Sequence, residues 1–213
     1  MRCEGAELMA GQPSFVEEPA DTREAIMRAT YLALCEYGYA NLTIQHIADE
    51  FEKSKSLLYH HYAGKDELLL DFLEFMLDRF EERIPFPSEP DEQAYLEAIL
   101  DRVLVTPLPD DYRDFSRAMV ELRAQAAHDP DYRDYFTRSD QFFRKQVTRL
   151  VRAGVDRGAF RDVDPERTAA LVQAVVIGAM TQRVTGDEDL ASTVRTELDR
   201  YLRAAVYREG LRP

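Results

Sequence analysis

Apolar residues recur along this chain at the three- and four-residue spacing of amphipathic helices. Between residues 22 and 37, Ile26, Ala29 and Ala33 share one helical face, and we expect this helix to end at Gly38, which suits a left-handed C-terminal position. No segment alternates for long in the manner of a strand. The pattern predicts an all-α protein of about nine helices, at 22–37, 44–51, 55–61, 65–83, 91–105, 110–127, 130–157, 165–184 and 188–207.

Aspartate and proline mark where later helices begin. Asp129 and Asp164 each precede a proline, so a capping carboxylate comes directly before a residue that fits the first helical turn. Residues 1–20 contain four glutamates, glycines and prolines with little periodicity, which indicates a flexible acidic leader. We expect this leader to be followed by a small N-terminal domain over 21–64 and a larger helical domain over 65–213.

Two short predicted helices, joined by three residues, form a helix-turn-helix candidate. Thr43 can cap the first helix, while Leu42 can pack against Ile47 as a hydrophobic staple. Ser54 is the natural cap of the second helix. A chance helical hairpin is the alternative interpretation of this pattern taken alone.

The second helix of this motif has one face that can pack and one that can contact DNA. Leu58, His61 and Tyr62 lie three and four residues apart and share the first face. The other face carries groups that hydrogen bond to phosphates and base edges, and the next helix begins with an ammonium beside free N–H groups that can hold a phosphate. With the preceding turn and a leucine able to contact a thymine methyl, the DNA-contact candidates are Lys53, Lys55, Ser56, Leu57, Tyr59, His60 and Lys65.

The net charge of −13 argues at first against nucleic acid, which is itself a polyanion. However, the chain holds only four lysines, and three of them fall between residues 53 and 65, where there is no aspartate or glutamate. Positive charge is therefore concentrated on the helix-turn-helix candidate. An acidic surface with few lysines also keeps a protein hydrated in concentrated salt, so a halophilic protein and an ordinary acidic protein are both open interpretations.

Residues 22 to about 70 resemble the DNA-binding domain of TetR-type transcriptional regulators. The resemblance is carried by Gly38-Tyr39, Thr43, Ile47-Ala48, Ser54-Lys55, the run from Leu58 to Tyr62, and the run from Lys65 to Leu68. It implies that double-stranded operator DNA is contacted by Thr43, Lys55, Ser56, Tyr59, His60 and Lys65. Glu52 stands where the family usually has glycine, and would cost about 1 kcal/mol if its φ were positive.

Residues 65–213 contain no phosphate-binding loop, nucleophile elbow or Cys/His cluster, so we expect neither enzymatic activity nor a metal or cofactor. Aromatic residues at helical spacing there are ordinarily core. In the TetR family this region encloses a small-molecule pocket, and residues 121–130 resemble the BetI-like subgroup, some of which respond to choline. The resemblance implies a small-molecule effector, with pocket candidates Phe75, Met76, Phe115, Met119, Arg123 and Phe143.

From Ala169 to Met180 every residue except Gln173 is apolar or glycine. These 12 residues are too few to span a bilayer, so the helix must be buried on all sides. Together with the next helix it can form a four-helix interface with a second copy, although the core of a monomer is the alternative. The interface candidates are Val172, Val176, Ala179, Leu190, Val194, Leu198 and Leu202.

We therefore expect a cytoplasmic homodimer that represses transcription at a pseudo-palindromic operator and is released by a small molecule. The absence of a signal-peptide pattern and of a disulfide framework around Cys3 and Cys35 favours the cytoplasm, and we expect no membrane partner. Two other function classes stay open. One is a helical protein-interaction module that does not bind DNA, and the other is an enzyme.

Overall fold

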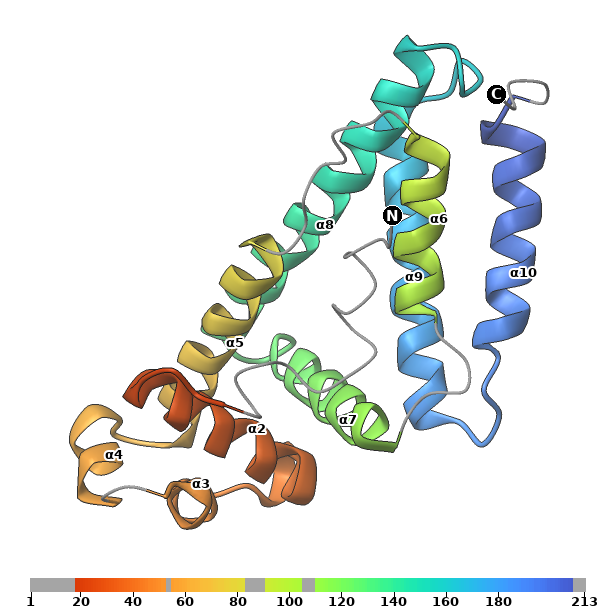
Figure 1. Ribbon diagram of the computed structural model, residues 1–213. Coiled ribbons are helices and arrows are strands. Elements are labelled where there is room, and N and C mark those ends of the chain that lie inside the picture. The colour runs from red at the N-terminus through yellow and green to blue at the C-terminus, as the bar shows by residue number, and fades with distance from the viewer. Residues whose placement is uncertain (1–17, 53–54, 83–90, 105–109, 209–213) are drawn as a thin grey trace. The chain divides into compact units, whose positions relative to one another are not determined.

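The computed structural model describes residues 18–52, 55–82, 91–104 and 110–208 (Figure 1). In these segments every predicted helix is present and no strand is formed, which confirms the all-α prediction. The predicted leader over 1–20 lies almost entirely outside the described residues, as do Lys53 and Ser54. The helices are α2 (Thr22–Asn41), α3 (Ile44–Glu50), α4 (Lys55–His61), α5 (Lys65–Glu82), α6 (Glu92–Val103), α7 (Asp110–Gln125), α8 (Pro130–Asp156), α9 (Pro165–Thr185), α10 (Ala191–Tyr201) and a closing π-helical turn η1 (Leu202–Val206).

The described residues form two compact units, and α8 contributes to both. The first unit combines the segments up to residue 82 with residues 110–136, and the second combines 91–104 with 137–208. Helix α7 and the first turns of α8 are thus in one unit with the helix-turn-helix. Each compact unit therefore combines two separate stretches of the chain, whereas the sequence pattern predicts a single division after residue 64. None of the helices in the described segments has the length and apolarity needed to cross a membrane.

In the first unit, a helix cap, a hydrophobic staple and a glycine define where the helices of the helix-turn-helix begin and end. Thr43 caps α3, since its hydroxyl accepts a hydrogen bond from the His46 N–H at 3.1 Å. Leu42 and Ile47 are both buried, as the hydrophobic staple requires. Gly38 has φ of 64° and breaks the helical path within α2, as the sequence predicts. Helix α7 packs along α2 (Figure 1).

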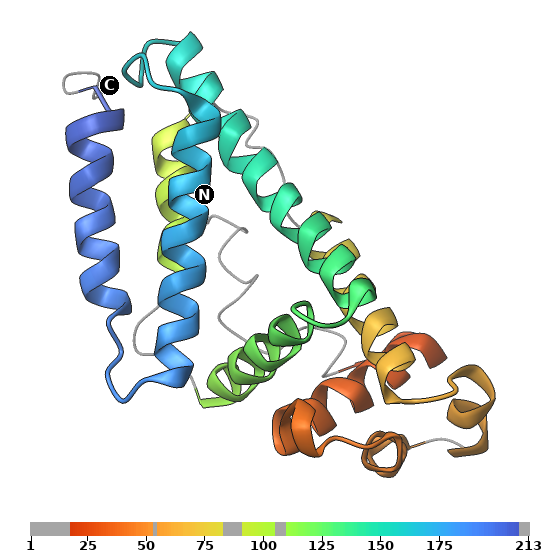
Figure 2. The same ribbon diagram turned by 180° about the vertical axis from the view of Figure 1, so that it is seen from behind.

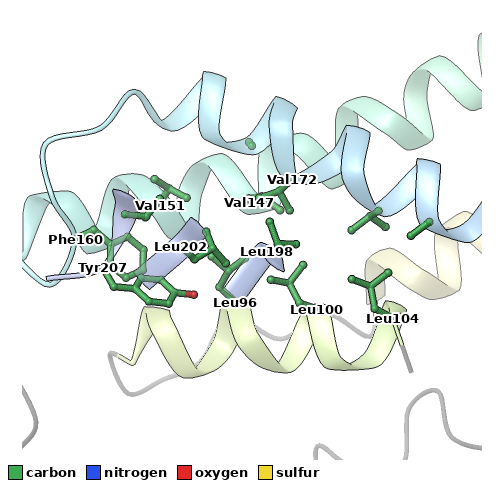
Figure 3. Packing of buried hydrophobic residues seen from close by; sticks show 14 residues of the cluster. Leu96, Leu100, Leu104, Val147, Val151, Phe160, Val172, Leu198, Leu202 and Tyr207 are labelled. Atoms are coloured by element: carbon green, nitrogen blue, oxygen red, sulfur yellow. The ribbon is translucent and has the colours of Figure 1, made fainter. Parts of the chain in front are cut away.

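The core of the second unit collects leucines and valines from four helices (Figure 3). Phe160 follows α8 and pairs with Tyr207 through an isolated β-bridge, with ring centroids 5.2 Å apart. A Cβ at Gly154 would lie 2.4 Å from the Phe160 ring, so only glycine allows this close approach. Val206 and Tyr207 are thereby attached to the loop between α8 and α9, where the Arg161 N–H donates to the Val206 carbonyl at 2.7 Å.

Helix α9 lies beside α10 in both views (Figures 1 and 2). Much of the apolar surface of α9 is buried against other helices of the same chain. Most of the residues predicted to face a second copy are instead packed in this core, because α6, α8 and α10 cover that side of α9. The structure corrects their assignment in this respect. The buried ones are Val172, Val176, Ala179, Leu198 and Leu202, whereas Val194 is half-buried and Leu190 is exposed.

Candidate nucleic-acid interface

Helix α4 separates its side chains largely as the spacing predicts. Leu58 is fully buried, and the half-buried Tyr62 donates its hydroxyl to Asp71 at 2.5 Å. His61 was expected on the packed face but is exposed. Leu57 lies half-buried at the boundary between the two faces. The polar candidates on the opposite face are all exposed, namely Lys55, Ser56, Tyr59 and His60.

A chain of hydrogen bonds joins the exposed faces of α3 and α4. The Tyr59 hydroxyl donates to Gln45 Oε1 at 2.8 Å, and Gln45 Nε2 donates to Asp49 Oδ1 at 2.9 Å. The Lys55 ammonium forms an ion pair with the same carboxylate. The hydrogen bond from Lys55, followed by that from Gln45, lowers the pKa of Asp49 below its ordinary value.

The sequence pattern did not single out Gln45 or Asp49 as members of this surface. A signal was available, since both are polar residues one turn apart on the first helix of the motif, close to the Thr43 cap. Thr43 itself is exposed, and its hydroxyl is engaged by the cap. The pairing of α3 with Tyr59 depends on the packing angle between two helices, which periodicity does not specify.

Glu52, which follows α3, avoids the backbone strain that a positive φ would cause. No residue other than glycine has a positive φ in the described segments, so the cost of a left-handed glutamate does not arise. The Glu52 carboxylate accepts a hydrogen bond from Arg28 of α2 at 3.0 Å. Because the Glu52 side chain is 80% exposed, this ion pair contributes little to stability.

Lys65, a predicted phosphate contact, is engaged inside the chain. Its ammonium donates to the Tyr39 carbonyl at 3.0 Å and lies 4.4 Å from the centre of the Tyr39 ring. The side chain therefore joins the start of α5 to the end of α2. An ammonium has three donors, so a phosphate contact by Lys65 stays a prediction.

Tyr39 connects the end of α2 to three other helices of the first unit. Its backbone N–H donates to Glu121 Oε2 of α7 at 2.6 Å, and its hydroxyl donates to Asp66 of α5 at 3.2 Å. The same Asp66 oxygen accepts the hydroxyl of Tyr132 on α8, also at 3.2 Å. Burial, and then the Asp66 charge, raises the pKa of both tyrosines above the ordinary value. Residues that lead into α3 are thus tied to α5, α7 and α8.

Among the predicted pocket residues, Phe75 and Phe115 have defined packing partners. Phe75 is buried and lies near two guanidinium groups, 5.4 Å from that of Arg23 and 4.9 Å from that of Arg79. Phe115 packs on Tyr31 of α2 with ring centroids 5.1 Å apart. These contacts give both rings a structural role in the first unit, and a role in a pocket stays a prediction.

The other pocket candidates are divided between the units. The Arg123 guanidinium lies 4.6 Å from the centre of the Phe136 ring in the first unit, where Met76 and Met119 are half-buried. Phe143 belongs to the second unit and packs against its core. The described part of the chain contains no group of three or more histidine, cysteine, aspartate or glutamate side chains placed to hold a metal ion.

Comparisons with known proteins match both halves of the chain. The model of the TetR family of bacterial regulatory proteins matches residues 26–72, and that of the BetI-type transcriptional repressor C-terminal region matches residues 92–206. The solved structure of a TetR transcription regulator from Haloarcula marismortui is 37% identical, covers 87% of this chain and 98% of its own, and superimposes with a TM-score of 0.79.

More distant relatives include a solved structure with the same fold and a curated repressor that is similar in sequence. A transcriptional regulator from Saccharomonospora viridis, solved in complex with choline, is 22% identical and has a TM-score of 0.76, with 88% of this chain and 98% of that chain covered. Among curated proteins, the transcriptional repressor AcnR of Corynebacterium efficiens is 23% identical over 171 residues, which are 80% of this chain and 86% of AcnR.

Proposed function

Because the chain belongs to the TetR family of DNA-binding transcriptional regulators, which are not enzymes, we propose that it is a homodimeric repressor released from its operator by a small molecule. The observation that carries DNA recognition is the exposed polar surface of α3 and α4, with Lys55, Ser56, Tyr59 and His60 on one helix face. These side chains can hydrogen bond to phosphates and base edges in the major groove. A regulator of this kind works where the DNA is, in the cytoplasm.

DNA binding is tested by gel mobility shift on DNA flanking the gene. Lys55→Ala should weaken binding to all sequences and reduce the dependence of log affinity on log salt by about 1 for each phosphate that the lysine no longer neutralises. Lys145→Ala is the matched control, because Lys145 is an exposed lysine of α8. An unchanged salt dependence in Lys55→Ala would remove this lysine from the DNA surface. Failure of the wild type to shift any fragment would favour a protein-interaction module.

The homodimer is supported by the side of α9 that the described part of its own chain leaves exposed. Ala170, Leu171, Ala174 and Gly178 recur there at helical spacing and are all exposed. Nearby in sequence, Leu190 is 40% exposed, as large an exposed apolar side chain as Leu171 at 43%. Small residues in such a stripe allow helices of two copies to approach closely. This face replaces the buried valines and leucines as the proposed interface.

The effector is proposed to be a small molecule bound in the C-terminal region, with a quaternary ammonium compound as the first to test. The BetI-type match and the choline complex of the Saccharomonospora viridis relative support that choice. Aromatic faces attract such cations. Choline chloride should release the DNA in a mobility shift, whereas sodium chloride at equal concentration controls for ionic strength. Equal release by both salts would exclude choline as the effector.

A saline cytoplasm is the setting we propose for this regulator. The net charge of −13 and the scarcity of lysine support it, as does the 37% identity to a protein from Haloarcula marismortui. The helical circular dichroism signal should then be retained in molar potassium chloride and decrease on dilution. A fold that is equally stable in dilute buffer would contradict a halophilic adaptation.

A further inference from the structure

Gln45 is held in a defined orientation on the surface proposed to face DNA. It is exposed and is the second residue of α3. Two exposed partners contact its amide, the Tyr59 hydroxyl at Oε1 and the Asp49 carboxylate at Nε2. The amide is therefore fixed from both sides while it stays open to an incoming base.

The chemistry of the two partners determines which end of the amide points where. An ionised carboxylate can only accept hydrogen bonds, so the NH₂ group must face Asp49. The lowered pKa of Asp49 keeps that carboxylate ionised. The Tyr59 hydroxyl then donates to the amide oxygen on the other side. Exchange of the amide oxygen and nitrogen would turn the oxygen toward the Asp49 carboxylate and break that hydrogen bond, whereas the Tyr59 hydroxyl could accept from the nitrogen instead. The contact with Asp49 therefore makes one orientation preferred.

After these two bonds, the amide retains one N–H donor and one oxygen lone pair. This remaining pair matches adenine, which presents an N7 acceptor and an N6 donor side by side in the major groove. Guanine presents two acceptors there, N7 and O6, and would leave the Gln45 oxygen facing another oxygen. The ion pair with Lys55 compensates the Asp49 charge, so the carboxylate can orient Gln45 near DNA without an isolated negative charge.

We propose that Gln45 is a specificity-determining residue that reads one adenine in each half of the operator, and that Asp49 and Tyr59 position its amide. The inference rests on the proposed function, since it requires α3 and α4 to enter the major groove. It adds a base-reading residue on α3 to the contacts expected from α4.

The test is a selection of DNA duplexes with a randomised central segment, read by sequencing, for the wild type and for Gln45→Ala, Gln45→Glu and Gln141→Ala. The wild type should enrich a palindrome with adenine at one position of each half-site, and Gln45→Ala should lose the preference at that position alone. Gln45→Glu should prefer cytosine there, because a carboxylate accepts from the cytosine N4 donor. Gln141, an exposed glutamine of α8, provides the matched control.

Affinities for the selected duplex and its guanine variant quantify the effect. The wild type should bind the guanine variant about 5- to 150-fold more weakly for each half-site changed. Asp49→Asn should reduce this ratio, because an asparagine can accept or donate and no longer fixes the amide orientation. If Gln45→Ala and Gln45→Glu select the wild-type palindrome unchanged, the inference is overturned and the proposed function stands. If the wild type enriches no sequence, both are overturned.

Discussion

Replacing Gly38 with alanine would test the joint between α2 and α7. Gly38 has φ of 64° and ψ of 167°, a backbone region that is almost confined to glycine. An alanine Cβ would also lie 3.0 Å from Glu121 Oε2, the oxygen that accepts the Tyr39 N–H. The substitution therefore strains the backbone and pushes against the carboxylate that holds the end of α2.

The two effects have separate magnitudes. The backbone conformation should cost about 1–3 kcal/mol of unfolding free energy. If the methyl group displaces Glu121, the charged hydrogen bond to Tyr39 is broken as well, at about 1.5–3 kcal/mol. Glu121→Ala alone should lose only this second amount. In the double variant the hydrogen bond is already absent, so the total loss should be close to that of Gly38→Ala alone.

Urea unfolding followed by circular dichroism measures all three variants, at one protein concentration because oligomers are stabilised by mass action. Gly64→Ala is the control, since a Cβ at Gly64 would meet no atom within 4 Å. Gly64 precedes α5 and its carbonyl accepts from the Leu68 N–H, so it stands at the N-cap of that helix. The unfolding free energy of Gly64→Ala should therefore decrease by at most about 1 kcal/mol, because alanine is a poorer N-cap than glycine. If the loss in the double variant equals the sum of the single losses within about 0.5 kcal/mol, Gly38 and Glu121 are independent and the reasoning fails.

In the described segments a Cβ at Gly178 would meet no atom within 4 Å, so Gly178→Glu should leave the chain folded. Light scattering should show that this variant is a monomer, and a folded dimer would refute the α9 interface. The buried Tyr207 hydroxyl has no hydrogen-bond partner in the described segments, so Tyr207→Phe should maintain or raise the unfolding free energy. Tyr132→Phe loses the hydrogen bond to Asp66 and should lower the unfolding free energy by about 1 kcal/mol. Equal decreases in the two variants would contradict this distinction. Because burial raises the folded-state pKa of Tyr132 above the ordinary 10.0, its contribution is complete below that pH and is lost as the pH rises toward the folded-state value. The urea midpoint should therefore decrease above about pH 10, and less steeply in Tyr132→Phe than in the wild type; identical profiles would exclude this tyrosine as the cause.

Features that depend on neighbouring residues could be predicted from the sequence. The Thr43 cap, the positive φ of Gly38 and the Asp164 cap on α9 are all present. Each is decided within one turn of helix, by a side chain that reaches a nearby N–H or by a glycine that has no Cβ. For the same reason the sorting of α4 into buried Leu58 and exposed Tyr59 follows from spacing alone.

Features that join distant parts of the chain could not be predicted in this way. Tyr39 and Glu121 are 82 positions apart, and a helical period identifies the face that packs without naming its partner. The same holds for Lys65, whose preference for Tyr39 depends on where α5 begins in space. In α9 the apolar composition predicts burial, but the structure shows that its own chain covers Val176 and leaves Gly178 exposed.

The interleaving of the two compact units has a consequence for protein engineering. A chimeric regulator made by joining residues 1–64 to a foreign sensor would separate Tyr39 from both Glu121 and Asp66. The graft would retain the helix-turn-helix but lose the side chains that hold the end of α2 in place. A transferable DNA-binding module would instead also include residues 110–136. Because these residues are separated in sequence from the helix-turn-helix, they would have to be inserted as a second segment into the sensor domain of the recipient. Modularity in this protein follows proximity in space, and its boundaries do not coincide with a single cut in the sequence.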